Sequence, residues 1–93
     1  MKWLEVIELR SADGNREQLE QILNNLINEL ARETKKQTTV VYKHVMIDTD
    51  FSIHLTHDTM KVDSSGSQLG LRIMASLKEY VLVNHSIWVE RSI

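Results

Sequence analysis

The chain has no cysteine and no proline, and only three of its 93 residues are glycine. Without cysteine it can form no disulfide, no thiolate metal site and no cysteine nucleophile. The scarcity of glycine and proline excludes collagen-like and low-complexity classes, and a hydrophobic content of 42% excludes intrinsic disorder. The length fits one domain that spans residues 1–93.

Neither sign of charge dominates, because eleven basic side chains face thirteen acidic ones and give a formal net charge of −2. A nucleic-acid partner requires a basic surface, so we expect none. No apolar run approaches the roughly 20 residues that cross a bilayer, so we expect no membrane partner. The charged start, Met1–Glu5, is unlike a signal peptide, and we predict a cytoplasmic protein.

Hydrophobic periodicity divides the chain into six segments in the order β-α-β-β-α-β. Residues 2–11 are apolar on both parities, as in an inner strand, and a turn at 12–15 with Asn15 as N-cap leads into an amphipathic helix over 16–33. Residues 38–47 and 51–58 form a predicted hairpin, and residues 84–90 form a last strand. Between the hairpin and the last strand, the spacing predicts a second helix with one buried apolar side, made of Ile73, Met74, Leu77, Tyr80 and Val81.

This order predicts a ferredoxin-like α+β sandwich, because right-handed crossovers place both helices on one face of an antiparallel sheet of order 4-1-3-2. If the hairpin loop is Asp48–Asp50, Ile47 lies opposite Phe51, and His44 lies opposite His54.

The sheet face without helices decides what the protein could bind. Apart from Lys43, whose long side chain can reach past the helix to solvent, the odd residues from 41 to 55 are apolar and suit the helices: Val41, Val45, Ile47, Phe51, Ile53 and Leu55. The other face then carries mainly aromatic and polar side chains: Trp3, Glu5, Tyr42, His44, Met46, Ser52, His54, Thr56, Ser86, Trp88 and Glu90. Because soluble monomers rarely expose such a patch, we expect a homodimer in which two of these faces meet. The two sheets could also enclose a ligand pocket; a filled interface fits the sequence equally well.

In the pocket hypothesis, His54 or His44 is the general base toward an acidic hydroxyl of a small aromatic ligand. Trp88, Trp3 and Tyr42 stack on that ligand, and Thr56 and Ser86 supply hydroxyls. His54 and His57 lie three residues apart on a strand, so they point to opposite faces and cannot share a metal. His44, His54 and a glutamate could form a three-ligand site, but we predict no metal because polar partners explain such histidines more simply.

The segment at the start of the second helix is rich in serine and is a candidate anion site: Ser64, Ser65, Gly66 and Ser67. Its backbone N–H groups and the side chain of Arg72 could bind the anion. Capping by Ser65 or Ser67 explains the same residues without a ligand. Gly70, in the first turn of this helix, suggests close packing.

The stretch Ser11–Leu19, together with the length and element order, resembles the dimeric α/β-barrel superfamily typified by antibiotic-biosynthesis monooxygenase-like proteins. It looks like the family's turn and charged helix start after the first strand. The resemblance implies a homodimer joined through its sheets, often with an internal cavity. Some members oxidise phenolic or quinol substrates without metal or flavin, some degrade haem, and others have no assigned activity. No catalytic residue carries over.

We therefore predict a small homodimeric protein that binds or oxidises a phenol- or quinol-type ligand in a sheet-side pocket without a cofactor. The alternative is a non-catalytic interaction or regulatory module whose polar sheet face only specifies the dimer.

Overall fold

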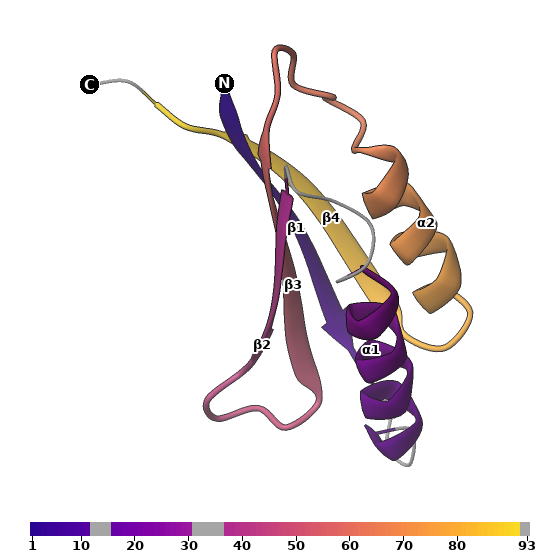
Figure 1. The fold of residues 1–93 in the computed structure, drawn as a ribbon. Coiled ribbons are helices and arrows are strands. Elements are labelled where there is room, and N and C mark those ends of the chain that lie inside the picture. The colour runs from indigo at the N-terminus through magenta and orange to yellow at the C-terminus, as the bar shows by residue number, and fades with distance from the viewer. Residues whose placement is uncertain (12–15, 31–36, 92–93) are drawn as a thin grey trace.

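A computed structural model of the chain describes residues 1–11, 16–30 and 37–91 (Figure 1). The elements are β1 (Lys2–Arg10), α1 (Arg16–Leu30), β2 (Gln37–Lys43), β3 (Asp50–Asp58), α2 (Gln68–Leu77) and β4 (Leu82–Val89). This is the predicted β-α-β-β-α-β order. The predicted turn at 12–15 with its Asn15 cap, and the predicted helix end at 31–33, lie outside the described residues.

The four strands form one sheet of order β2-β3-β1-β4, in which every neighbouring pair is antiparallel. Read from the opposite edge, this is the predicted order 4-1-3-2. Both helices lie on the same side of the sheet (Figure 1). The ferredoxin-like sandwich is therefore confirmed, and β2 and β4 are its edge strands.

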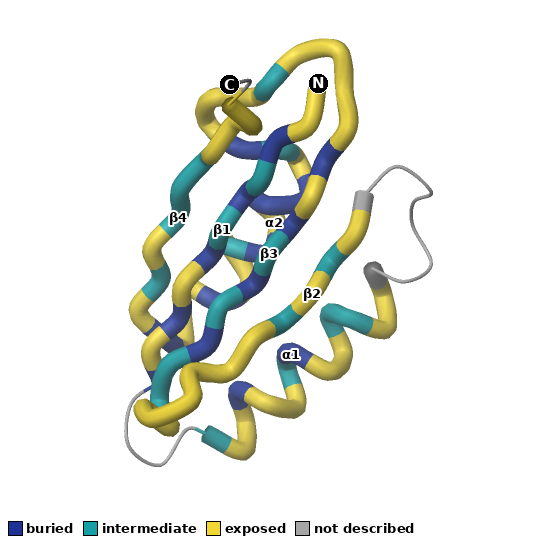
Figure 2. Tube along the Cα trace, turned by 90° about the vertical axis from the view of Figure 1, so that its left-hand side faces the viewer, coloured by how far each residue is buried: buried dark blue, intermediate teal, exposed yellow. Residues whose placement is uncertain are grey.

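The core fills the space between the sheet and the two helices. Most of its strand residues come from the central strands β1 and β3, where Figure 2 shows the buried positions alternating with less buried ones. α1 contributes Leu19 and Leu23, and α2 contributes Ile73 and Leu77, as predicted. Tyr80 was predicted to lie on the same buried side, but α2 ends at Leu77 and Tyr80 is exposed beyond it. No helix in the described part of the chain is long and apolar enough to span a membrane.

The predicted orientation of β1 is wrong. Trp3 and Glu5 lie on the helix side with Ile7 and Leu9, and all four are buried. Leu4 and Val6, which are half-buried, face the other way. Both parities of this strand are apolar, so its own pattern does not choose a face; the pairing with β3 and β4 chooses it.

The predicted register of the hairpin is also wrong. β2 ends at Lys43, and His54 lies opposite Val40 instead of His44. The connection spans residues 44–49, because Nδ1 of His44 accepts the backbone N–H groups of Met46 and Ile47 at 3.0 Å each. The shift is four residues, an even number, so the strand residues keep their predicted faces. Val45, Met46 and Ile47 leave the sheet for this exposed loop.

Candidate functional site

The open face of the sheet carries most of the residues predicted to bind a ligand. Tyr42 and His54 lie on adjacent strands with ring centroids 4.6 Å apart, and Tyr42 is half exposed. On the other edge strand, Trp88 is 60% exposed and its Nε1 donates a hydrogen bond to Ser86 Oγ at 2.9 Å. The central strand contributes Leu4 and Val6 between them. This face, built from residues of all four strands, is called the open face below.

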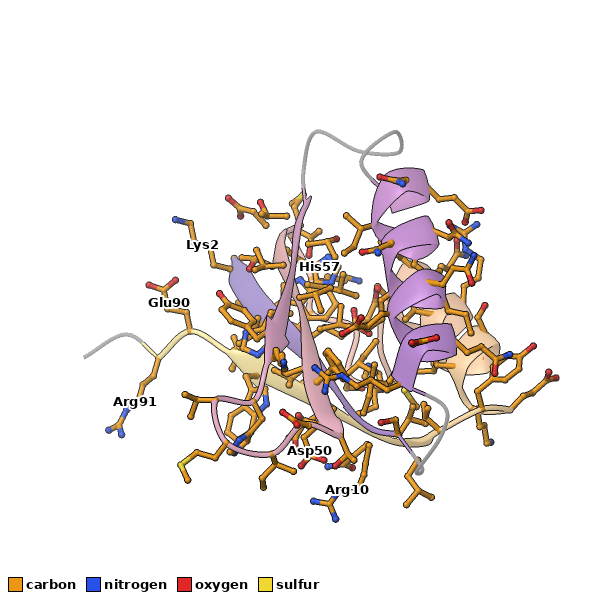
Figure 3. All side chains as sticks on the ribbon, turned by 90° about the horizontal axis from the view of Figure 1, so that it is seen from below. Lys2, Arg10, Asp50, His57, Glu90 and Arg91 are labelled. Carbon is orange, nitrogen blue, oxygen red and sulfur yellow. The ribbon has the colours of Figure 1, made fainter. Side chains whose placement is uncertain are left out.

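A groove of about 360 Å³ lies at one end of the sheet, where β1 begins and β4 ends. It is lined by Lys2, Trp3, Leu4, Thr56, Trp88, Val89 and Glu90. Three of the predicted ligand-binding residues, Trp88, Trp3 and Thr56, therefore border one hollow. In Figure 3, Lys2, Glu90 and Arg91 extend outward at this end of the sheet.

Two of the predicted residues are placed differently from the expectation. Trp3 is only 3% exposed, because its indole stacks on the ring of His57 at 4.1 Å and donates a hydrogen bond from Nε1 to Thr59 Oγ1 at 2.8 Å. His44 lies outside the strands, where its Nδ1 accepts backbone N–H groups of its own loop. With Tyr42 and Ser52 it borders a separate hollow of about 200 Å³ at the other end of the face.

A buried polar cluster on the helix side was not anticipated. Its centre is the carboxylate of Glu5, which has no exposed surface. Oε1 of this carboxylate accepts hydrogen bonds from Ser67 Oγ at 2.6 Å and His57 Nε2 at 2.9 Å. Oε2 accepts from the Ser67 backbone N–H at 3.1 Å and His85 Nε2 at 2.7 Å. Glu5, His57, His85 and Ser67 are called the buried cluster below.

Each member of the cluster comes from a different part of the fold. Glu5 lies on β1, His57 on the neighbouring strand β3, and His85 on the other neighbour, β4. Ser67 is the N-cap of α2, where its Oγ accepts the backbone N–H of Gly70 at 2.9 Å. Figure 3 shows His57 pointing between the sheet and the helices.

Two glycines make room for the carboxylate and the His85 ring. A Cβ atom on Gly70 would lie 1.9 Å from Glu5 Oε2, and one on Gly66 would lie 2.4 Å from Cε1 of His85. Gly66 has a φ of 105°, which side chains rarely adopt. The close packing suggested by Gly70 is thus an approach to a buried charge.

Burial by itself raises the pKa of Glu5, because it removes the charged form from water. The hydrogen bonds from Ser67, His57 and His85 outweigh this effect and hold the pKa below its usual value of 4.5. Glu5 is therefore ionised at neutral pH and can only accept hydrogen bonds. The N-terminus of α2 adds a favourable dipole interaction with the same charge.

The predicted anion site at the start of α2 is occupied from within the chain. The backbone N–H and the hydroxyl of Ser67 both bind the Glu5 carboxylate. Ser64, Ser65 and Arg72 are exposed, and Gly66 is buried against His85. An internal carboxylate and the Ser67 cap together explain why these residues stand here.

Sequence parity held a signal for the buried cluster. Glu5 shares its parity with Trp3, Ile7 and Leu9, and His57 shares its parity with Ile53 and Leu55. A polar residue within a buried apolar parity requires a polar partner. That rule would have pointed to Glu5 and His57, but not to their mutual contact. In the described residues, no group of three or more His, Asp, Glu or Cys side chains is arranged to hold a metal ion.

Comparison with known proteins confirms the class of fold. No family model and no curated protein matches the sequence. Solved structures do match, and their folds are those of antibiotic-biosynthesis monooxygenase-like proteins. The predicted resemblance is therefore confirmed at the level of the fold.

The individual matches cover nearly whole chains at low identity. Rv0793 from Mycobacterium tuberculosis is 12% identical with a TM-score of 0.74, over 100% of this chain and 98% of that one. A protein from Nitrosomonas europaea, provisionally named an antibiotic-biosynthesis monooxygenase, is 11% identical with a TM-score of 0.72, over 96% and 89%. SnoaB, a cofactor-independent oxygenase from Streptomyces nogalater, is 11% identical with a TM-score of 0.68, over 99% and 95%.

Proposed function

We propose that this chain forms a homodimer through the open face and binds a small aromatic ligand of the phenol or quinol type there. The dimer is supported by the apolar surface of this face. Trp88 is 60% exposed, Tyr42 50% and Val40 40%, and the half-buried Leu4 and Val6 lie between them. Soluble monomers rarely leave such a continuous surface in water, and a second copy supplies a matching one.

The observation that carries the ligand proposal is the groove beside Trp88. Its volume of about 360 Å³ is within the range of small-molecule sites, and the indole offers a face for stacking. The hydrogen bond from Trp88 Nε1 to Ser86 holds that indole in one orientation. A partner subunit on the open face would close the groove from the solvent side.

His54 is the proposed general base. It lies on the open face of β3 two residues from Thr56, which borders the groove, and Tyr42 packs against its ring. Removal of the hydroxyl proton leaves an electron-rich phenolate, which molecular oxygen can oxidise. In the complete reaction a phenol and one O₂ give a quinone and one water. The fold likeness to an oxygenase that works without a cofactor supports this chemistry.

Ligand binding is tested by calorimetric titration of the protein with a panel of quinols and flavonoids. We expect binding by wild type and at least tenfold weaker binding by Trp88→Ala. The matched control is Leu71→Ala, which removes an exposed side chain from α2 and should bind as wild type does. Equal affinity of Trp88→Ala and wild type would refute the groove as the site.

Catalysis and assembly are tested separately. Oxygen consumption with a bound quinol should fall in His54→Gln while its binding persists. Light scattering should return twice the chain mass of 10.8 kDa at micromolar concentration. A dimer that binds no member of the panel would favour the non-catalytic interaction module. In that case the contact between His54 and Tyr42 would only shape the dimer interface.

A further inference from the structure

The buried cluster contributes chemistry that the core does not need. Its neighbours Ile7 and Leu9 on the same face of β1 are apolar and fully covered. A buried ionic group often adds nothing to stability, and apolar replacements of similar volume are often neutral or stabilising. Here two histidines hydrogen-bond one buried carboxylate, and two glycines leave room for the carboxylate and for one of the histidine rings. Such a constellation of titratable groups is characteristic of functional sites.

The hydrogen bonds determine where the histidine protons lie. Because the ionised Glu5 carboxylate can only accept, His57 and His85 must each donate from Nε2. In the neutral imidazole the proton then occupies Nε2, and Nδ1 carries the free lone pair. No hydrogen bond reaches either Nδ1 from the described part of the chain. In the neutral form each Nδ1 is therefore a base whose orientation is fixed by the hydrogen bond from Nε2 to Glu5.

The two histidines differ in access. The ring of His57 is covered by the stacked indole of Trp3, and its side chain is 4% exposed. The His85 side chain is 13% exposed and lies on the edge strand β4. Gly66, in the loop before α2, lies against Cε1 of its ring. His85 is thus the more accessible of the two histidines that donate to Glu5.

We propose that Glu5 and His85 form an acid–base dyad in which Nδ1 of His85 takes a proton from a small neutral molecule at the β4 edge. Glu5 is the positioning residue: it orients the ring and stabilises the imidazolium that forms. His57 and Ser67 hold the carboxylate in place. This site lies on the face of the sheet opposite the open face, and it does not depend on the function proposed there.

Charge and shape define the class of substrate. With both histidines neutral, the buried cluster carries one negative charge, so it repels anions. A proton transferred from the substrate to His85 is attracted by the Glu5 carboxylate, whose Oε2 lies 2.7 Å from Nε2 of the ring. The neighbours of His85 on the same face of β4 are Val83 and Ile87, both apolar and half-buried. The dyad therefore suits an uncharged, apolar carbon or oxygen acid.

The probe for this activity is 5-nitrobenzisoxazole, a neutral aromatic carbon acid. His85 Nδ1 takes the proton from C3, the C–H electron pair forms the nitrile, and the N–O bond breaks to release a coloured phenolate. No oxidant or cofactor takes part. We expect wild type to exceed the rate with free imidazole at the same concentration. A wild-type rate equal to that of imidazole would overturn the proposal.

Substitution of His85 locates the base. A positioned general base contributes about 100-fold or more, so His85→Gln should lose a factor of that size. Added imidazole should restore activity to His85→Ala. Glu79→Gln, which removes an exposed carboxylate just beyond α2, is the control and should keep the wild-type rate. Retention of the rate in His85→Gln would overturn the proposal.

A spectroscopic measurement keeps the role of Glu5 testable even if its variants do not fold. In wild type labelled with ¹⁵N-histidine at pH 8, His85 should show a protonated Nε2 and an unprotonated Nδ1. In Glu5→Gln the tautomer preference should weaken and the elimination rate should fall at least tenfold, since loss of a tautomer-positioning carboxylate can cost up to about 10⁴-fold. The opposite tautomer, or an even mixture in wild type, would show that Glu5 does not position the base.

Discussion

Replacement of Gly70 by alanine tests the buried cluster through protein stability. On an ordinary helix this change stabilises by about 1 kcal/mol, because alanine is the better helix former. Here the added Cβ would lie 1.9 Å from Oε2 of Glu5, 2.4 Å from its Cδ and 2.7 Å from Oε1. The carboxylate must therefore move by about 1 Å, since real Cβ contacts essentially never fall below 3.0 Å.

The movement has two costs. Overpacking a filled site costs about 1–3 kcal/mol. Displacement of Oε2 also breaks at least one charged hydrogen bond, from Ser67 N–H or His85, which costs about 1.5–3 kcal/mol. After subtraction of the helix gain, we expect Gly70→Ala to lower the free energy of unfolding by about 1.5–5 kcal/mol.

Urea denaturation followed by circular dichroism measures this change, with an unaltered m-value as evidence that unfolding stays two-state. A double-mutant cycle with Glu5→Ala is the control, because removal of the carboxylate frees the space that the new Cβ needs. In that background Gly70→Ala should become neutral or stabilising. If Gly70→Ala stabilised the wild type by the helix propensity alone, the close approach of Glu5 to α2 would be refuted.

Three further outcomes follow from the same contacts. The lowered pKa of Glu5 gives stability that is present above its usual value of 4.5 and is lost as pH falls through the folded value, so acid should destabilise wild type more than Glu5→Gln in pH-dependent thermal melts. Trp88→Ala should weaken self-association in sedimentation experiments, whereas Leu71→Ala on α2 should not; equal weakening by both would contradict the open-face dimer. His44→Ala removes the acceptor of two exposed backbone N–H groups and should cost about 1 kcal/mol in urea denaturation, with no change implying that the loop holds itself.

The helices and the order of the elements were predictable because their signals are local. The 3.6-residue repeat placed Leu19, Leu23, Ile73 and Leu77 toward the sheet, where they are buried. The two-residue repeat of β3 placed His54 and His57 on opposite faces, as observed. The helix cap at Ser67 was one of the two serines that the serine-rich loop offered.

The predictions that were wrong depended on distant parts of the chain. The register of the hairpin follows from the loop that His44 organises, and strand composition does not encode it. The sequence of β1 does not show that Trp3 faces the helices, because Trp3 and Ile7 on one parity and Leu4 and Val6 on the other are all apolar. Tyr42, His54 and Trp88 do lie on the open face, as predicted. The hairpin register differs from the prediction by an even number of residues, so Tyr42 and His54 keep their face. Trp88 lies on the less apolar parity of β4, which points away from the helices.

The sequence by itself determined which segments are helices and strands, their order, and the helix sides that meet the sheet, because each depends on residues a few positions apart. Only the tertiary structure decided which face of β1 is buried and what Glu5 contacts. Its partners His57, Ser67 and His85 lie 52, 62 and 80 residues along the chain. Contacts at that separation are set by strand pairing and by the placement of α2 over the sheet, which no local pattern specifies.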